Sequence, residues 1–242
     1  MDYQKINELL LKLKSAYKSI GKEDCTMDYQ KIDELLLKLK SAYKSIGAEA
    51  NLVVEKPASR TEVEEVEKRL GRKLPIQIRD FFLQYSKKCE FSAYLPDDLE
   101  LPDALESIFC ADFIISLEDL ADIEKVRKGW VETCFNDEDD EYDAVWHHKL
   151  GFMQVPNGDI IAFDVKKRET NPPVVYLSHD DGEGHGYILG KDFNTFFEQL
   201  LLVGACGNED WQMLPFCLDA ESGIVSDCEN AKEYRKIIGL QI

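Results

Sequence analysis

The sequence predicts an α+β fold, a single domain with an antiparallel or mixed sheet flanked by helices and preceded by a duplicated amphipathic helix. Three observations carry this expectation. Two short amphipathic helices are readable in residues 60–86, two short apolar segments flank Asn157-Gly158, and aromatic and leucine residues recur at helical spacing in residues 192–203. The Asn-Gly pair is typical of a β-hairpin. Hairpins with helices at both ends favour this class over a parallel doubly wound sheet.

The N-terminal segment contains a tandem repeat. Residues 27–47 repeat residues 1–21 with a single change, Asn7 to Asp33. In each copy, apolar residues recur in alternating steps of three and four, which is the spacing of an amphipathic helix. The short break at residues 21–26 suits an antiparallel helical hairpin, and one continuous bent helix is the open alternative.

We expect two units, a duplicated helix pair in residues 1–47 and an α+β domain in residues 48–242. Only the second copy of the helix connects directly to the domain. It should therefore pack on the domain through Leu36, Leu39 and Tyr43, whereas the first copy should be dispensable. Two copies are too few for a solenoid.

The helix pair in residues 60–86 carries its own start and stop signals. Ser59 or Thr61 can cap the first helix, because each is followed three positions later by a glutamate that completes a capping box. Gly71 supplies the backbone freedom that ends this helix. Pro75 suits the first turn of the second helix, where its missing N–H is not needed. The apolar face of the second helix, which has to be buried, consists of Ile78, Phe81, Phe82 and Tyr85.

The rest of the chain reads as strands followed by helices. In the Asn157-Gly158 turn both residues should have positive φ. One side of the expected helix in residues 117–134 carries Leu120, Ile123, Val126 and Trp130. A terminal helix should be capped by Ser226 with Glu229. The expected strands are 107–116, 149–155, 160–165, 174–177 and 186–189.

The charge distribution is strongly uneven. The chain has 47 acidic and 29 basic residues, a net charge of −18, and residues 1–46 carry +2 (9 basic minus 7 acidic), which leaves −20 for residues 47–242. Such a field repels nucleic acid and anionic membranes and attracts basic proteins. A solvated surface that aids solubility is the commoner explanation for any one cluster. The candidate partner-binding residues are acids that we expect to be exposed, Asp137, Glu138, Asp139, Asp140, Glu141 and Asp143, with Asp180, Asp181 and Glu183 as a second edge.

Cysteine usage and the N-terminus point to the cytoplasm. The seven cysteines are odd in number and form no C-x-x-C pair, so they read as reduced thiols rather than a disulfide framework or a zinc cluster. Lysines run through the first twenty residues, which excludes an uncharged signal-peptide core. No apolar run is long enough to span a bilayer.

Catalytic and metal chemistry is not expected. His179, Asp180 and Asp181 with His185 are the best candidates for a metal or hydrolase site, and a polar turn is the favoured alternative. His147 and His148 form a weaker candidate, since neighbours on a strand point to opposite faces. The chain has no nucleophile-elbow, P-loop or dinucleotide fingerprint, so no cofactor is expected.

Several of these features together resemble the SUKH superfamily, which takes in bacterial immunity proteins of toxin systems and fungal regulators of cell-wall synthesis. The resemblance covers roughly residues 52–203 and depends on the order and spacing of all the motifs. Asp159 and Asp164 occupy positions that recur in the family, and turn capping and strand-end hydrogen bonds are their favoured roles. The matching motifs are Leu70-Gly71, Leu74-Pro75 before a helix with paired aromatics, Gly158-Asp159 with Asp164, Val174-Val175-Tyr176, and the helix in residues 192–203.

The resemblance implies a non-enzymatic immunity protein that neutralises a cognate toxin, commonly a nuclease, in the cytosol. An acidic surface fits this role, because nuclease active sites are basic. The alternative is a regulatory scaffold like the fungal members, although a scaffold would be expected to carry long disordered arms. An enzyme acting through His179 and Asp180 ranks third.

Overall fold

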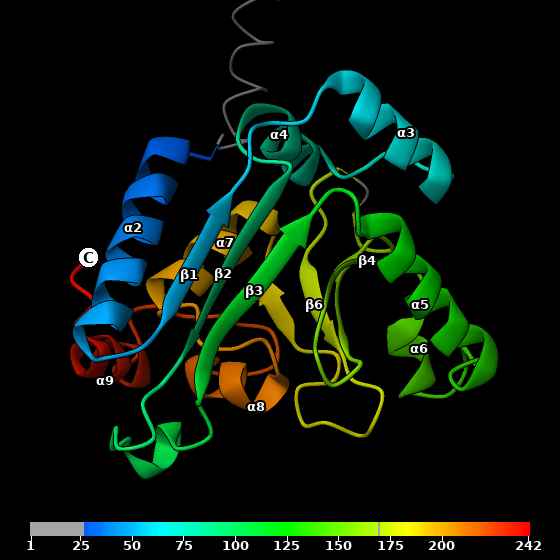
Figure 1. The fold of residues 1–242 in the computed structure, drawn as a ribbon. Coiled ribbons are helices and arrows are strands. Elements are labelled where there is room, and N and C mark those ends of the chain that lie inside the picture. The colour runs from blue at the N-terminus through cyan, green and yellow to red at the C-terminus, as the bar shows by residue number, and fades with distance from the viewer. Residues whose placement is uncertain (1–26, 169) are drawn as a thin grey trace, which may run out of the picture.

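The computed structural model describes residues 27–168 and 170–242, and it confirms the α+β fold (Figure 1). In these residues the chain forms α-helices and two antiparallel sheets. The helices are α2 (Tyr29–Ser45), α3 (Arg60–Leu70), α4 (Ile76–Gln84), α5 (Leu120–Thr133), α6 (Asp143–Trp146), α7 (Phe193–Leu202), α8 (Asp210–Met213) and α9 (Glu229–Ile238), with 3-10 turns η1 (Asp103–Leu105) and η2 (Leu214–Phe216).

The first sheet has the order β1-β2-β3, built from β1 (Ala50–Val54), β2 (Lys88–Tyr94) and β3 (Cys110–Ser116). Only the third of these strands was predicted. Ala50 pairs with Ala93, and Phe91 pairs with Phe113, so each strand bonds to a partner far away in the sequence.

The second sheet has the order β4-β5-β6-β7, built from β4 (Lys149–Gln154), β5 (Ile160–Asp164), β6 (Val174–Leu177) and β7 (Ile188–Gly190). The predicted β4–β5 hairpin is confirmed, but its turn geometry differs from the prediction. Gly158 alone has a positive φ, 107°, whereas Asn157 does not. Val155 donates its N–H to the carbonyl of Asp159 (2.9 Å), so the loop between these two residues holds three residues instead of two, and Gly158 donates its N–H to the carbonyl of Val155 (3.0 Å) within it.

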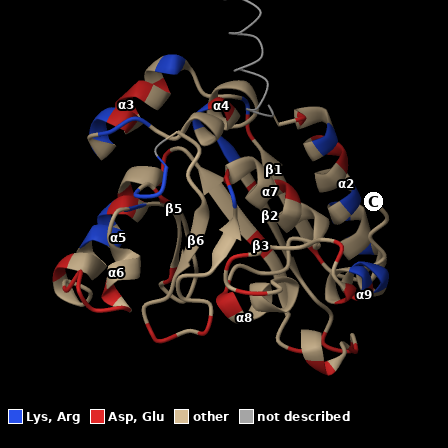
Figure 2. Cartoon of the chain, turned by 180° about the vertical axis from the view of Figure 1, so that it is seen from behind, with Lys and Arg blue, Asp and Glu red and all other residues tan. Residues whose placement is uncertain are grey.

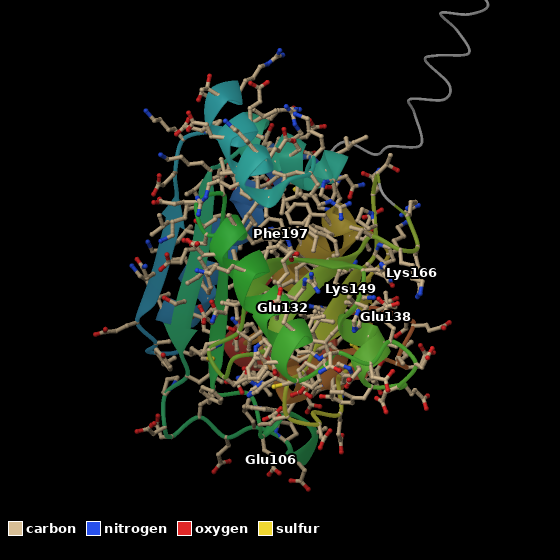
Figure 3. The ribbon with its side chains drawn as sticks, turned by 90° about the vertical axis from the view of Figure 1, so that its right-hand side faces the viewer. Glu106, Glu132, Glu138, Lys149, Lys166 and Phe197 are labelled. Carbon is tan, nitrogen blue, oxygen red and sulfur yellow. The ribbon has the colours of Figure 1, made fainter. Side chains whose placement is uncertain are left out.

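Phenylalanine rings fill the space between the two sheets and α7. Phe81 of α4 meets Phe197 of α7 with ring centroids 5.5 Å apart, and Phe113 of β3 meets the same ring at 5.5 Å. Phe197 lies in the interior of the molecule (Figure 3). Phe152 of β4 stacks on Phe163 of β5 at 4.4 Å. The core thus joins both sheets to the helices. Edge-to-face aromatic pairs contribute an interaction energy beyond that of the apolar area that they bury.

The second copy of the N-terminal repeat forms α2, and its predicted packing is confirmed. Leu36, Leu39 and Tyr43 are buried in the same core as the sheets. The helix begins behind Asp28, whose side chain accepts the N–H of Lys31, a typical N-cap bond. The first copy lies outside the described residues.

Local signals in the next two helices were largely read correctly. Ser59 caps α3, and Glu62 completes the capping box. Gly71, at φ 72°, ends α3 in the left-handed conformation. Pro75 is the N-cap residue of α4, one position before the first turn in which it was predicted. The apolar face of α4 is buried as expected through Ile78, Phe81, Phe82 and Tyr85.

Two expectations about later helices were wrong. Cys228, not Ser226, is the N-cap residue of α9, and its thiol accepts the N–H of Ala231. Val126 of α5 is exposed, because the buried side of that helix carries the ion pair of Arg127 with Glu124. The guanidinium also donates to the carbonyl of Trp146 (2.7 Å), which ties α5 to α6.

A second, smaller core lies between α5, α6 and the outer face of the second sheet. Trp146 is fully buried there and stacks on Phe135 at 4.8 Å. Ile160 and Val175 contribute the sheet side. This core fixes the lower end of the second sheet, where the acidic loops emerge (Figure 1).

Candidate functional site

Asp159, at the end of the β4–β5 hairpin, is buried and accepts four hydrogen bonds. Its Oδ1 accepts from the backbone N–H of His179 (2.8 Å) and from Nδ1 of the same residue (2.6 Å). Its Oδ2 accepts from the hydroxyl of Tyr176 (2.8 Å) and from the side-chain amide of Asn157 (2.9 Å). Burial of a carboxylate is tolerated when its oxygens are bonded in this way. Asp159 thus joins the hairpin turn, β6 and the loop after β6.

Asp164, the other position that recurs in the family, holds the opposite end of β5. Its carboxylate lies 3.5 Å from the ammonium of Lys149, and both side chains are buried. It also accepts the N–H of Lys166 (3.2 Å) just beyond the strand. Burial lowers the pKa of Lys149, although the neighbouring Asp164 carboxylate opposes this shift. Lys149 is buried and Lys166 is exposed, and Figure 3 labels them toward the middle and near the right-hand edge of the molecule. Both aspartates therefore have the turn and strand-end bonds that their positions predict.

Asp159, His179 and Asp180 form a group of potential metal ligands, with one donor atom of each within 4.8 Å of the others. The donors already have protein partners, however. Nδ1 of His179 is bonded to Asp159, and Asp180 accepts the hydroxyl of Ser178 (2.9 Å). A cation bound here would have to displace these bonds, so the arrangement fits a hydrogen-bond network better than an ion cage.

His185 does not join that group, contrary to the candidate site proposed from the sequence. Its Nδ1 accepts the N–H of Ser178 (3.0 Å), and its Nε2 bonds to the carbonyl of Tyr142 (3.0 Å). Its ring stacks on that of Tyr142, with centroids 3.8 Å apart. Burial lowers the pKa of His185, which favours the neutral ring. Both ring nitrogens are engaged, so the imidazole serves as a structural link.

Tyr142 joins the two acidic loops into one surface. Its hydroxyl donates to the carbonyl of Ser178 (2.7 Å) and accepts the N–H of Asp181 (3.1 Å). The indole N–H of Trp146 donates to the same Ser178 carbonyl (3.1 Å). The two segments that the sequence presented as separate edges, residues 137–143 and 178–185, are thereby brought together.

The carboxylates of residues 137–143 divide into inward and outward groups. Asp140 accepts the N–H groups of Tyr142 (2.9 Å) and Asp143 (3.1 Å), and Asp143 accepts the N–H of Asp137 (3.1 Å). Asp137 accepts the N–H of Asp139 (3.0 Å). Three of the six carboxylates therefore hold the loop in shape. Asp143 is half-buried rather than exposed, which corrects the expectation that all six face solvent.

His147 and His148 share one carboxylate, against the expectation that neighbours point apart. Glu138 Oε1 lies 3.0 Å from Nδ1 of His147 and 3.6 Å from Nε2 of His148. The prediction assumed an extended strand, but β4 begins only at Lys149 and His148 has a left-handed backbone, φ 55°. Nε2 of His147 also bonds to the carbonyl of Phe135 (2.8 Å). The pair holds Glu138 near the start of the acidic loop, at the right of Figure 3 and just below its middle.

The glycines of the second acidic loop make room for Asp210, a residue that sequence reasoning missed. A Cβ on Gly182 would lie 2.5 Å from Asp210 Oδ2, and one on Gly184 would lie 2.5 Å from Asp210 Cβ. Asp210 accepts the N–H of Gly184 (2.9 Å), and its own N–H donates to the Tyr176 hydroxyl (3.1 Å). The glycines at positions 182 and 184 therefore reflect close packing against α8, and they mark the loop as a tertiary contact.

The carboxylates that face outward are Asp139, Glu141, Asp181 and Glu183. All four are exposed, and none of them forms a side-chain hydrogen bond or ion pair with any residue that the structure describes. Neither loop contains Lys or Arg. Seen from behind in Figure 2, the loops at the lower end of the molecule are coloured for acidic residues, whereas α3 and α5 carry much of the basic colour.

Two features close to the acidic loops in the sequence or in space are an exposed tryptophan, Trp211, and the carboxyl group of Glu209. Trp211 on α8 is exposed, whereas Trp146 is core and Trp130 is half-buried against the His179 ring at 4.9 Å. Burial, reinforced by the carboxylates of Asp159, Asp210 and Asp180, raises the pKa of Glu209. Trp211 is therefore the exposed tryptophan of the three, and it directly follows Asp210, which contacts the second acidic loop.

Two comparisons with known proteins bear on the family of this chain. The model of the SMI1 / KNR4 family (SUKH-1) matches residues 57–199, which is more than half of the chain. No curated protein matches the chain. None of the helices in the described residues is both long enough and apolar enough to span a membrane.

Proposed function

Because the chain belongs to the SMI1 / KNR4 family (SUKH-1), we propose that it is an immunity protein that binds and neutralises a basic toxin, of which a nuclease fits best. Membership of the family supports an immunity or regulatory role in general. The finer assignment depends on the surface made by residues 137–143 and 178–185, which we call the acidic surface.

The acidic surface carries the proposal because it is both charged and held in shape. Inward carboxylates and the Tyr142 hydroxyl fix the two loops, so binding would require little further ordering of the backbone. The outward carboxylates project from this frame. A nuclease binds phosphates with positive groups, and a rigid array of carboxylates can occupy the same positions.

Long-range attraction also suits the role. An immunity protein has to capture its toxin before the toxin reaches nucleic acid, so a fast association rate is valuable. Complementary charge raises association rates by orders of magnitude at low salt. The net charge of −18 and the clustering of acids at one end of the molecule provide that field.

A non-enzymatic mechanism is part of the proposal. The histidines and aspartates that resemble a hydrolase site are bonded to one another and to the backbone, as the contacts of Asp159 and His185 illustrate. Inhibition would follow from steric and electrostatic blocking of the toxin, without turnover. We place this encounter in the cytosol of the cell that produces the toxin.

A nuclease-protection assay tests the proposal. The probe is the product of the gene immediately upstream, which the proposal expects to be a large protein with a C-terminal nuclease domain, and that domain is incubated with plasmid DNA. Equimolar chain should abolish cleavage, and the block should be stoichiometric. Tight binding that leaves cleavage intact would instead assign the chain to the regulatory class, and the absence of binding would overturn the proposal.

A further inference from the structure

The second copy of the repeat occupies a seat formed by β1, α7 and α9 together with Tyr85 at the end of α4, which we call the α2 seat. The hydroxyl of Tyr43 donates to the carbonyl of Gly204 (2.7 Å) and bonds to the hydroxyl of Tyr234 (2.9 Å). Both tyrosines are fully buried. These bonds fix the C-terminal end of α2.

The N-terminal end of α2 is held by aromatic and charged contacts. Tyr29 stacks on Tyr85 with centroids 5.0 Å apart. The Tyr85 hydroxyl donates to Asp33 Oδ1 (2.7 Å). The ammonium of Lys31 forms an ion pair with Glu198 of α7. The seat therefore recognises both the apolar stripe and the polar flanks of the helix.

Every residue of α2 that makes one of these contacts, except one, has an identical counterpart 26 positions earlier in the sequence. The exception is Asp33, which corresponds to Asn7. An asparagine Oδ1 accepts a hydrogen bond from a tyrosine hydroxyl, although the bond lacks the charge that strengthens the aspartate bond. The counterparts of the contacting and buried residues are Tyr3, Lys5, Ile6, Leu9, Leu10, Leu13, Ala16 and Tyr17.

We propose that the α2 seat is a helix-binding site with two ligands in the same chain, and that residues 3–20 occupy it when α2 is displaced. The resident helix is favoured by its Asp33 bond and by its short connection to β1. Occupancy by the first copy would leave residues 21–49 as a loop before β1, and the entropy cost of loop closure grows only slowly with loop length. The exchange would expose the apolar face of the displaced copy for contact with a partner.

Three variants of the full chain test whether the first copy can replace α2. Each places aspartates in the apolar face of one or both copies, and cooperative unfolding in urea is measured. The first carries Leu36→Asp and Leu39→Asp, the second carries Leu10→Asp and Leu13→Asp, and the third carries all four substitutions. The first two variants should unfold cooperatively in urea, with the second matching the wild type. The third should lose cooperative unfolding. Equal loss in the first and third variants would overturn the proposal.

Carbodiimide coupling identifies the occupant directly, because it joins an ammonium to a carboxylate in contact with it. In the wild type the product should link Lys31 to Glu198, and in the Leu36→Asp, Leu39→Asp variant it should link Lys5 to Glu198. Trypsin separates the two products, since the peptide with Lys5 begins at Met1 and the peptide with Lys31 begins after Lys22. A dimer held together by the Lys5 link would overturn the assignment to the same chain.

A milder variant gives the same test without disturbing the core. Asp33→Asn removes the single difference between the copies, so the ratio of the Lys5 product to the Lys31 product should rise several-fold over the wild type. An unchanged ratio would overturn the proposal.

Discussion

The ring of Tyr142 lies flat on the imidazole of His185, with centroids 3.8 Å apart, and His185 Nε2 bonds to the carbonyl of Tyr142 at 3.0 Å. One residue belongs to each acidic loop. This contact, with the bonds of the Tyr142 hydroxyl, makes a single surface from two segments more than thirty residues apart.

Tyr142→Phe should loosen the acidic surface while keeping its charge. The substitution removes the bonds to Ser178 and Asp181 but preserves the stacked ring. We expect a loss of about 1 kcal/mol in the free energy of unfolding. Urea denaturation measures this loss, and Tyr94→Phe, at an exposed position, is the matched control with no expected change. Equal effects of the two substitutions would show that the hydroxyl does not join the loops.

Asp159→Asn should destabilise the protein by about 2 kcal/mol, because an amide group would face donors that now bond to a carboxylate. Asp181→Asn is the control, since Asp181 is exposed and asparagine tolerates its positive φ of 62°. Thermal denaturation compares the two variants. If Asp159→Asn keeps full stability yet abolishes toxin binding, Asp159 is a contact residue and its structural assignment is wrong.

His185 should make stability depend on pH. Burial lowers its pKa, so the folded protein holds the neutral ring while the unfolded chain takes up a proton at about pH 6.5. The stability that depends on the neutral ring is therefore present above that pH and is lost as the pH falls below it. Protonation of Nδ1 would also break the bond from Ser178. His185→Gln should flatten the pH dependence of the urea midpoint between pH 7 and pH 5, and an unaltered dependence would exclude His185 as its source.

Asp112 on β3 should act in the opposite direction. Burial, together with the neighbouring Glu90 carboxylate, raises its pKa to about 6. The folded protein therefore prefers the protonated acid, and ionisation costs stability as the pH rises from about 4 to about 6. Asp112→Asn should stabilise the protein at pH 7.5 by about 1 kcal/mol, after allowance for partial exposure. The gain in stability should vanish near pH 4. An equal gain at pH 7.5 and at pH 4 would contradict a raised pKa of Asp112.

The sequence predicts the parts of this fold that depend on neighbouring residues. The capping box of Ser59 and the left-handed Gly71 are local, so both were readable. Strands β1 and β2 were missed because Ala50 finds its partner at Ala93, and no short-range pattern reports such a pairing.

In the candidate site, too, the features set by neighbouring residues were predicted and the contacts between distant segments were not. The acidic residues were visible in the sequence, but the residues that position them were not. Tyr142 and Asp210 act across the fold, through Ser178 and Gly184. The glycines at positions 182 and 184 were the available signal for Asp210, because a Cβ at either position would clash with its side chain. Asp140 illustrates the same limit, since its carboxylate caps α6 and is not free for a partner.

The most direct test of the account is the association rate of the chain with its toxin, measured by stopped flow at several salt concentrations. The test variant reverses three outward carboxylates, Asp139→Lys, Glu141→Lys and Glu183→Lys, and leaves the inward caps intact. The matched control is Glu64→Lys, Glu65→Lys and Glu118→Lys, which makes the same charge change at exposed positions away from the acidic surface.

We predict that the test variant associates about tenfold or more slowly than the wild type at low salt, while the control changes less. Raising the ionic strength from about 0.01 to about 0.15 M shortens the screening length from about 30 to about 8 Å, so it should slow the wild type and barely affect the test variant. An association rate that responds equally to both triple reversals, or to neither, would contradict binding through the acidic surface.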